Sequence, residues 1–363
     1  WDFNPHTKET IMNSLWDPVK LGNITLPHRF AMAPMTRSRA KPDGTPGDLA
    51  AEYYAQRASL GLIITEGTQP SDDGQGYTTT PGIYTDAHVA GWKKVTSAVH
   101  KAGGRIFIQL MHVGRMSHPD NTPHHRQPVA PSAVAPGQQM FTPTGMQDAP
   151  TPRALTPEEI KATVQDFRHA ARRAIVAGAD GVEIHGANGY LIQQFLAPNA
   201  NLRTDEYGGS IANRARFAIE VATAIADEIG PERTGFRISP AMPLGGLVEG
   251  EEGPELYRYL VAKLDKLKLA YLHFIHDGDE ALAKDIRKNW SSSLLLLRTK
   301  RSREALGEDV EVGLADVVPI GKWALANPDF VARFRKGAEL NAPDFATLFG
   351  GGAKGYIDYP ALA

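Results

Sequence analysis

The stretch that decides the fold of this chain is residues 181–196, which read GVEIHGANGYLIQQFL. It opens with the short apolar run Gly181–His185 and then continues into a longer segment. Short runs rich in Ile, Val, Leu and Phe are typical of parallel strands buried on both faces. Similar runs occur along the rest of the chain, at Phe30–Pro34, Leu62–Thr65, Arg105–Leu110, Gly235–Ser239, Tyr271–Ile275, Leu294–Leu297 and Asp316–Ile320.

Helical segments are predicted between these runs. The clearest start is Thr156-Pro157-Glu158-Glu159, which offers an N-cap, a proline at the first helical position and an acidic first turn. Strands that alternate with helices form right-handed βαβ units, and eight such units fit a closed (β/α)8 TIM barrel better than a doubly wound sheet. The predicted helices are Asp48–Ser59, Asp86–Ala102, Pro157 to about Gly178, Ile211–Ile229, Pro254–Leu267, Glu280–Asn289, Arg303–Glu311 and Asp329–Lys336.

Three segments lie outside this alternation. Val19–Leu26 alternates around Gly-Asn, which predicts an N-terminal β-hairpin that caps the barrel floor. The segment His112–Arg153, after the third strand, is rich in Pro, Gly, Ser and Gln and is too long for a plain connection, so we expect a functional loop insertion over the barrel mouth. Residues 1–11 are interpreted as a leader or as residues added before Met12, which leaves residues 12–363 as a single domain.

Composition excludes several classes of protein. Lys plus Arg number 39 and Asp plus Glu 41, a balance that gives no electrostatic footprint for nucleic acid or an anionic membrane. The chain has no cysteine, which excludes disulfides, iron–sulfur clusters and cysteine nucleophiles. No apolar run approaches the roughly 20 residues needed to span a bilayer. We therefore expect a cytoplasmic protein with no membrane or nucleic-acid partner.

Active-site groups in a TIM barrel lie at the carboxyl ends of the strands. The polar or small residues at these ends are Thr36, Glu66-Gly67, Gln109, His185, Arg237 and Lys322. This set has no carboxylate pair for glycoside hydrolysis and no zinc-binding histidine motif, and no lysine follows the sixth run to form a Schiff base. No metal site is expected.

The remaining candidate is His185, with Asn188 three residues later and then Tyr190. If the chain turns into a helix there, the first two lie on one face and can donate hydrogen bonds to one oxygen. A nearby tyrosine hydroxyl can donate a proton. The spacing also arises by chance, and a histidine at a strand end is more often structural, so the residues alone leave both interpretations open.

Longer strings resemble the old yellow enzyme family. FAMAPMTR at residues 30–37 resembles its first barrel strand, and EIHGANGYLIQQFL at residues 183–196 resembles its fourth. The likeness extends from about Leu15 to the C-terminus and implies a flavin mononucleotide (FMN)-binding barrel. It also implies an NAD(P)H-dependent enzyme that reduces the activated C=C bonds of enones and related electron-poor alkenes. Further matching residues are Asn199, Asn201, Arg203, Asp205, Tyr207–Ser210, Asn213-Arg214, Ala326–Asp329 and Gly350–Pro360.

The resemblance also implies roles for individual residues. Gln109 and Arg237 would bond the pyrimidine edge of FMN, where a cation stabilises the anionic reduced flavin. His185 and Asn188 would hold the substrate's oxygen while hydride passes from flavin N5 and Tyr190 protonates the product. NADPH or NADH would use the same site, which predicts ping-pong kinetics. The other expected cofactor residues are Pro34, Met35, Thr36, Gly67, Arg298, Gly321 and Lys322, and the other substrate-pocket residues are Tyr77, Met111 and Phe349.

The chain departs from the family's pattern in four places. Phe349 stands where a tyrosine is frequent, and Met111 where a tryptophan is frequent. Lys322 replaces an arginine at the FMN phosphate and loses the bidentate fork. The segment LRTKR at residues 297–301 replaces a glycine-rich phosphate loop.

Four structural interpretations remain open at the sequence level. Arg237 can pair with Glu183 across the barrel, and Arg298 can be a surface charge. Gln109 can be a solvated strand end, and Tyr77 can be an ordinary packing residue. One alternative function also remains, a flavin-binding protein without turnover that works as a sensor or store. The sequence does not determine the natural alkene, the preferred nicotinamide, or whether the protein is a monomer or a homodimer.

Overall fold

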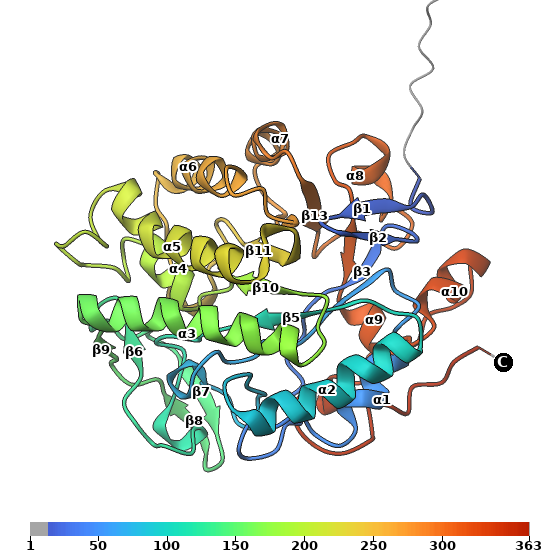
Figure 1. Cartoon of the computed structure of the whole chain (residues 1–363), viewed down its shortest axis with the longest axis horizontal. Coiled ribbons are helices and arrows are strands. Elements are labelled where there is room, and N and C mark those ends of the chain that lie inside the picture. Colours follow the sequence, from blue (N-terminus) through green and yellow to red (C-terminus); the bar gives the residue numbers. More distant parts are fainter. Residues whose placement is uncertain (1–13, 363) are drawn as a thin grey trace, which may run out of the picture.

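Eight parallel strands form the centre of the molecule in the computed structural model, which describes residues 14–362 (Figure 1). Their order in the sheet is β13-β12-β11-β10-β5-β4-β3-β14. The two ends of the sheet meet where Leu295 bridges Val317 and the Leu296 N–H donates to the Val317 carbonyl at 3.1 Å, which closes the barrel. The strands are β3 Phe30–Met32, β4 Leu62–Ile64, β5 Ile106–Leu110, β10 Gly181–His185, β11 Thr234–Ile238, β12 Tyr271–Ile275, β13 Ser293–Leu297 and β14 Val318–Ile320.

The predicted runs coincide with these strands to within two residues, and the barrel prediction is confirmed. The strands are almost entirely buried and mostly apolar because both faces of the sheet are covered. In β4, Leu62 and Ile64 point into the barrel interior and Ile63 packs in the outer core beneath the helices, as the two-residue period of a strand requires.

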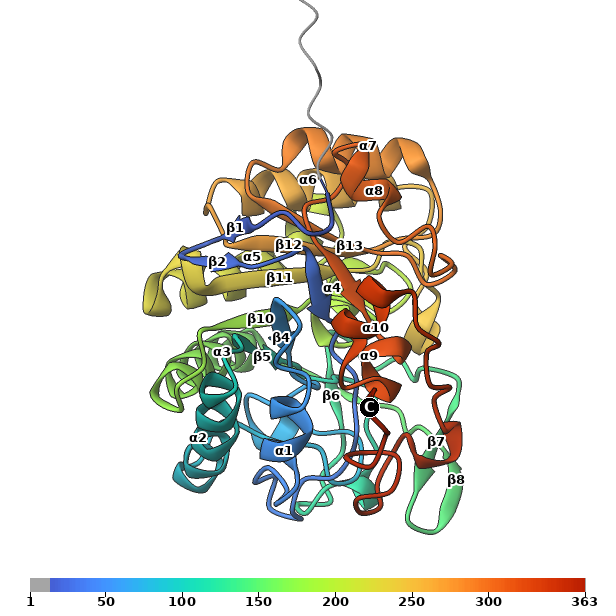
Figure 2. The ribbon, with the colours of Figure 1, turned by 90° about the vertical axis from the view of Figure 1, so that its right-hand side faces the viewer.

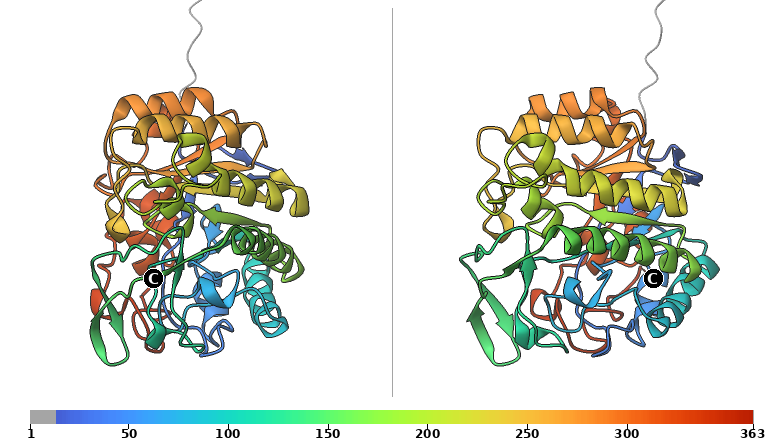
Figure 3. Two further views of the ribbon diagram at one scale, coloured as in Figure 1. Left: turned by 90° about the vertical axis from the view of Figure 1, so that its left-hand side faces the viewer. Right: turned by 60° about the vertical axis from the view of Figure 1, so that its left-hand side comes forward.

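Helices surround the sheet, as two further views show (Figure 3). The best-defined start is that of α3, where Thr156 Oγ1 accepts from the Glu159 N–H and the Glu159 carboxylate accepts from the Thr156 N–H. None of the helices in the described range is long and apolar enough to cross a membrane. The helices are α1 Ala50–Ala55, α2 Asp86–Lys101, α3 Pro157–Val176, α4 Leu191–Leu196, α5 Ile211–Ile229, α6 Gly253–Asp265, α7 Glu280–Asn289, α8 Glu308–Glu311, α9 Lys322–Ala326 and α10 Phe330–Lys336.

Four helices differ from the sequence prediction. The α1 helix ends at Ala55 rather than at Ser59. The α8 helix begins at Glu308 rather than at Arg303, whose guanidinium donates to the Ala338 carbonyl at 2.7 Å and so ties the preceding turn to the C-terminal region. The helices α4 and α9 were not predicted, because six and five residues are too few to establish a helical period.

The N-terminal hairpin lies against the amino ends of the barrel strands. Strands β1 (Val19–Leu21) and β2 (Ile24–Leu26) pair antiparallel around the Gly22 turn. Leu21 and Leu26 are fully buried in one cluster with interior barrel residues such as Phe107. The hairpin thus closes the floor of the barrel. The expected leader, residues 1–11, lies outside the described residues.

The long segment after β5 lies at the carboxyl ends of the strands. Its Arg115 donates to the Gly245 carbonyl, in the loop after β11, at 2.9 Å. Two short strands within it, β7 (Gln139–Thr142) and β8 (Gly145–Asp148), form a separate hairpin at the edge of the molecule (Figure 2). Another, β6 (Val129–Ala130), pairs with β9 (Arg153–Ala154), which holds the middle of the insertion against its C-terminal end.

Candidate active site

Strand register brings the predicted polar residues to the same end of the barrel. Gln109 of β5 lies beside Glu183 of β10, and His185 of β10 lies beside Arg237 of β11. Arg237 in turn lies beside His273 of β12. Paired residues of adjacent parallel strands point to the same face, so these side chains form neighbouring layers inside the barrel near its mouth.

The His185–Asn188 pair has the features of a binding clamp. The ring nitrogen Nδ1 of His185 and the amide oxygen Oδ1 of Asn188 are buried and have no hydrogen-bond partner within residues 14–362. Burial, together with Arg237, holds the pKa of His185 well below its usual value, so the imidazole is neutral and has one N–H to donate. Asn188 has a left-handed backbone, φ +55°, and its N–H donates to Ser239 Oγ at 2.9 Å.

Tyr190 lies next to this clamp. Its ring meets that of His185 edge to face at 5.1 Å, and its hydroxyl lies 3.0 Å from the Tyr77 hydroxyl. Burial and the neighbouring Tyr77 raise the pKa of Tyr190 well above its usual value, so the phenol keeps its proton at neutral pH. Met111, with its neighbours Val113 and Met116, forms an apolar wall against which both tyrosines pack.

Arg237 is a buried cation without a hydrogen-bond partner. Its side chain is 5% exposed and makes no hydrogen bond to residues 14–362. The carboxylate of Glu183 instead accepts from Gln109, Tyr271 and His273. Arg237 and Glu183 therefore do not form a simple ion pair inside the barrel. An unpaired buried guanidinium is costly unless a ligand takes its hydrogen bonds, which fits the pyrimidine edge of a flavin.

The expected flavin-lining residues frame the same mouth. Pro34, Met35 and Thr36 follow β3 and are half-buried, so they border open space. Gly67 follows β4, and a side chain there would collide with Met111, whose sulfur lies 2.4 Å from the position a Cβ would take. Glycine at this position is therefore dictated by the close approach of Met111 as well as by any ligand.

Arg298 corrects the sequence prediction for the phosphate end of the site. Its guanidinium is bound by Glu280 of α7 at 2.6 Å and by Asp309 of α8 at 3.1 Å, and it also donates to the His276 carbonyl. These partners accept hydrogen bonds from the guanidinium N–H groups that a phosphate would need. Lys322 follows β14 without an ion pair to residues 14–362 and is exposed beside Gly321, with its Nζ 5.3 Å from the Trp323 ring.

Phe349 also differs from its expected place. Its side chain is 66% exposed and does not belong to the apolar cluster that contains Met111 and Tyr77. The pocket wall instead includes Val113 and Met116, which the sequence reasoning missed. Their position two and five residues after Met111, at the start of the long insertion, is the signal that would have found them.

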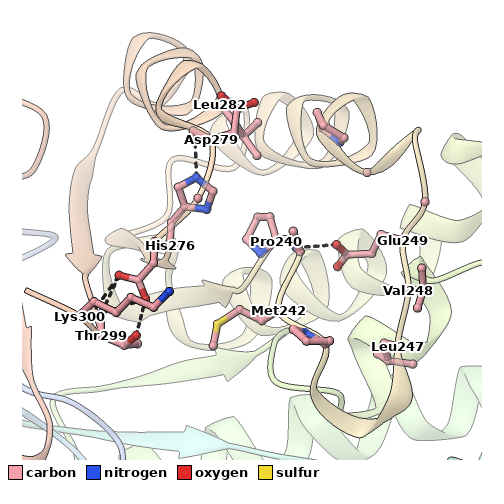
Figure 4. A pocket seen from close by; sticks show the side chains of 17 residues that line it. Pro240, Met242, Leu247, Val248, Glu249, His276, Asp279, Leu282, Thr299 and Lys300 are labelled. Carbon is pink, nitrogen blue, oxygen red and sulfur yellow. Dashed lines mark hydrogen bonds between the residues drawn. The ribbon is translucent and has the colours of Figure 1, made fainter.

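A second group that the sequence reasoning missed supports the clamp. Gln193 of α4 accepts from the Gly189 N–H at 2.8 Å and donates to the buried carboxylate of Glu249 at 2.7 Å. Glu249 also accepts from the Ala241 N–H at 2.7 Å, as the close-up shows (Figure 4). The turn that carries Asn188 is thereby tied to the loop after β11.

The cavity drawn in that close-up is not the predicted site. It has a volume of about 640 Å³ and lies between the loops that follow β11, β12 and β13. Its lining includes Met242, Glu249 and His276 but none of the predicted cofactor or substrate residues. The predicted site is therefore identified by its buried polar groups without hydrogen-bond partners in residues 14–362, and not by this cavity.

Known proteins resemble the chain over almost its whole length. Residues 14–341 match the family model described as the NADH:flavin oxidoreductase / NADH oxidase family. A probable flavin mononucleotide-dependent alkene reductase of Leishmania infantum is 44% identical, over 95% of this chain and 96% of its own. 12-Oxophytodienoate reductase 2 of Arabidopsis thaliana is 41% identical, over 99% and 98%.

Solved structures of known proteins also resemble this chain in fold and in sequence. Morphinone reductase in complex with tetrahydroNAD superimposes with a TM-score of 0.92 at 46% identity, covering 97% of this chain and 98% of its own. The old yellow enzyme homologue from Zymomonas mobilis gives a TM-score of 0.92 at 40% identity, covering 96% and 100%. With its barrel, its clamp and these matches, the chain belongs to the NADH:flavin oxidoreductase / NADH oxidase family, the FMN-dependent old yellow enzyme family.

Proposed function

We propose that this protein reduces activated C=C bonds of enones and related alkenes with hydride from NADPH or NADH, using FMN bound in the barrel mouth. The observation that carries the proposal is the convergence of His185, Asn188 and Tyr190 beside the unpaired cation Arg237. Relatives described as alkene and 12-oxophytodienoate reductases support the reaction class.

The residues at the mouth suit FMN in their chemistry. Pro34, Met35, Thr36 and Gly67 would line the ring system, and Gln109 and Arg237 would bond its pyrimidine edge. Gly321 and Lys322 would hold the phosphate, with Lys322 supplying the charge. Bound FMN supplies the hydride transfer from the nicotinamide to the alkene.

The clamp would bind the oxygen conjugated to the alkene. The single N–H of neutral His185 and the amide NH₂ of Asn188 can both donate to that oxygen. The oxygen becomes more negative as the β-carbon accepts hydride, so these two hydrogen bonds strengthen toward the transition state. The buried, uncharged imidazole donates without titrating in the neutral range, because its pKa is lowered.

Tyr190 would supply the proton to the α-carbon. Its phenol remains protonated because burial raises its pKa, and its hydroxyl is oriented by Tyr77 at 3.0 Å. Tyr77 and Met111 would contact the alkene, while Phe349 would reach it only if the C-terminal segment closed over the mouth.

Nicotinamide and alkene would occupy the same place in turn, which gives ping-pong kinetics. The solved relative that holds tetrahydroNAD supports a nicotinamide as the hydride donor. The proposed partners are small molecules, and the protein is proposed to work in the cytoplasm as a monomer or homodimer.

The decisive experiment loads the purified protein with FMN and measures NADPH and NADH oxidation with and without cyclohexenone. We expect oxidation that depends on the enone and parallel lines in double-reciprocal plots. A yellow protein whose nicotinamide oxidation is unaffected by every enone in a small panel would instead be a flavin-binding protein without turnover.

A further inference from the structure

The carboxylate of Glu183 lies at the centre of the barrel and has no role in the proposed reaction. The residue is fully buried on β10. Its Oε1 accepts from Gln109 Nε2 at 2.8 Å, and its Oε2 accepts from the Tyr271 hydroxyl at 3.0 Å and from His273 Nδ1 at 2.9 Å. Three donors on one buried carboxylate keep it ionised: burial opposes this, but His273, Arg237 and Gln109 hold its pKa below the usual value.

In this arrangement Glu183 can balance the charge of Arg237 without accepting hydrogen bonds from it. Glu183 lies near enough to Arg237 to balance its charge, yet the two side chains form no hydrogen bond or ion pair. Tyr271 and His273 engage Oε2 and Gln109 engages Oε1, so three of the roughly four acceptor positions of the carboxylate are taken by groups other than the guanidinium. Arg237 stays charged while its N–H groups remain available to a ligand.

The same carboxylate determines which end of Gln109 faces the mouth. An ionised carboxylate only accepts hydrogen bonds, so Gln109 must turn its NH₂ group toward Glu183. The carbonyl Oε1 of Gln109 is then the group left for a ligand. The barrel thus presents an acceptor from Gln109 together with donors from Arg237.

We infer that Glu183 is a positioning residue that sets the donor–acceptor pattern read by the pyrimidine edge of the flavin. That edge carries an N3–H donor between two carbonyl acceptors. The Gln109 carbonyl matches the N3–H, and the Arg237 guanidinium matches a carbonyl. The inference rests on the flavin site proposed above and assigns the amide orientation within it to Glu183.

The test compares FMN affinity in Glu183→Gln with that in the exchanged double variant Gln109→Glu/Glu183→Gln. In the single variant the new amide can keep its oxygen on Tyr271 and His273 and donate to Gln109, which must then turn its own NH₂ toward the flavin N3–H. The Gln109 NH₂ and the flavin N3–H would then be two donors that face each other, which should raise the Kd for FMN about tenfold. The double variant restores an acceptor at position 109 and should recover to within about threefold of the wild type.

A merely structural role for Glu183 makes the opposite forecast, since a second substitution in the same buried group would then weaken binding further. FMN binding is measured by fluorescence quenching on protein stripped of flavin, with thermal melts to verify folding. If the double variant binds FMN no better than Glu183→Gln, the inference is wrong. If the wild type itself does not bind FMN, the proposed flavin site fails first.

A second pair of variants keeps the inference testable if Glu183→Gln does not fold. Tyr271→Phe removes one donor from Oε2, which frees it to capture Arg237, and should weaken FMN binding about fivefold. The matched control is Tyr207→Phe, which removes a tyrosine donor 3.0 Å from Glu220 on the outer helix α5 and should leave the Kd unchanged. Equal affinities in the two variants would overturn the inference.

Discussion

Four buried polar atoms inside the barrel near its mouth lack a partner within residues 14–362: His185 Nδ1, Asn188 Oδ1, Arg237 Nε and His273 Nε2. Buried polar groups are nearly always hydrogen-bonded, so such atoms gathered in one place indicate a site for a polar ligand. At the residue scale, the proposed function depends on keeping the His185 ring and the Arg237 guanidinium available to a ligand.

The clamp can be tested by removing each of its members. His185→Ala and Asn188→Ala should each raise the Kd for a phenol about tenfold and slow enone reduction about a hundredfold, because each removes a hydrogen bond to the developing oxyanion. FMN affinity should remain at the wild-type value. Flavin absorbance during phenol titration and stopped-flow kinetics measure the two effects. A double variant that reduces enones at the wild-type rate would contradict the assignment.

The proton donor can be tested with two tyrosine variants. Tyr190→Phe should slow the alkene half-reaction about a hundredfold, since general acids contribute on that order, and should leave flavin reduction by NADPH unchanged. Tyr77→Phe is the matched control, because it removes only the hydroxyl that lies 3.0 Å from that of Tyr190. Its effect should be smaller. Equal slowing of both half-reactions in Tyr190→Phe would refute the role.

His112 makes stability depend on pH. Burial lowers its pKa to about 4, whereas the unfolded chain binds the proton near 6.5. The contribution of His112 to the free energy of unfolding is therefore complete above pH 6.5. This contribution is lost as the pH falls from 6.5 to 4, by up to about 3 kcal/mol. The variant His112→Asn retains an acceptor for the Gly114 N–H and should flatten this decline in urea denaturation curves. Parallel pH profiles in variant and wild type would exclude His112 as the cause.

At the scale of elements, the loop after β13 has a different role from the phosphate contact that the sequence predicts for it. Arg298 joins the end of this strand to α7 through Glu280 and to α8 through Asp309. Its charge is used to hold the outer helices, and the phosphate end of the site is left to the turn between β14 and α9, where Lys322 lies.

This division of labour predicts opposite effects for two substitutions. Arg298→Gln should lower the free energy of unfolding by about 1 kcal/mol and leave FMN affinity unchanged, because it removes the ion pairs with the exposed Glu280 and with Asp309, which keeps Arg301 as a partner. Lys322→Gln should leave stability unchanged and raise the Kd for FMN about tenfold, because it removes the phosphate's charge partner. Denaturation and FMN titration of both variants check the pair. An FMN affinity lowered by Arg298→Gln would restore the sequence prediction.

At the scale of the whole molecule, the barrel is a cylinder closed at one end and open at the other. The hairpin β1–β2 fills the amino end with Leu21 and Leu26, and the reactive groups lie at the carboxyl end. Stability and function are therefore placed at opposite ends, as is usual for this fold.

This separation can be measured with a floor variant. Leu26→Ala should lower the free energy of unfolding by about 2–5 kcal/mol, because a fully buried side chain leaves a cavity. The FMN-loaded enzyme should retain its turnover below the melting temperature. Lys20→Ala, an exposed position on the neighbouring strand, serves as the control and should change stability by less than about 0.5 kcal/mol. Loss of turnover in folded Leu26→Ala would show that the floor also shapes the site.

The sequence by itself determined the barrel, and it suggested the clamp only through its resemblance to the old yellow enzyme family. The strands were visible because their apolar runs are short and alternate with helical segments, and those signals are local. His185, Asn188 and Tyr190 were found together because the turn after β10 brings residues three to five apart into one place. Interactions between residues close in the chain can be read from spacing alone.

The tertiary structure alone decided which charges are free. Arg298 is 18 residues from Glu280 and 11 from Asp309, and Glu183 is 74 residues from Gln109 and 90 from His273. A charged side chain pairs with whatever partner packing brings nearest, and that partner lies on another element whose position no spacing reveals. For this reason Arg298 pairs with Glu280 and Asp309, whereas the Arg237 side chain makes no hydrogen bond within residues 14–362.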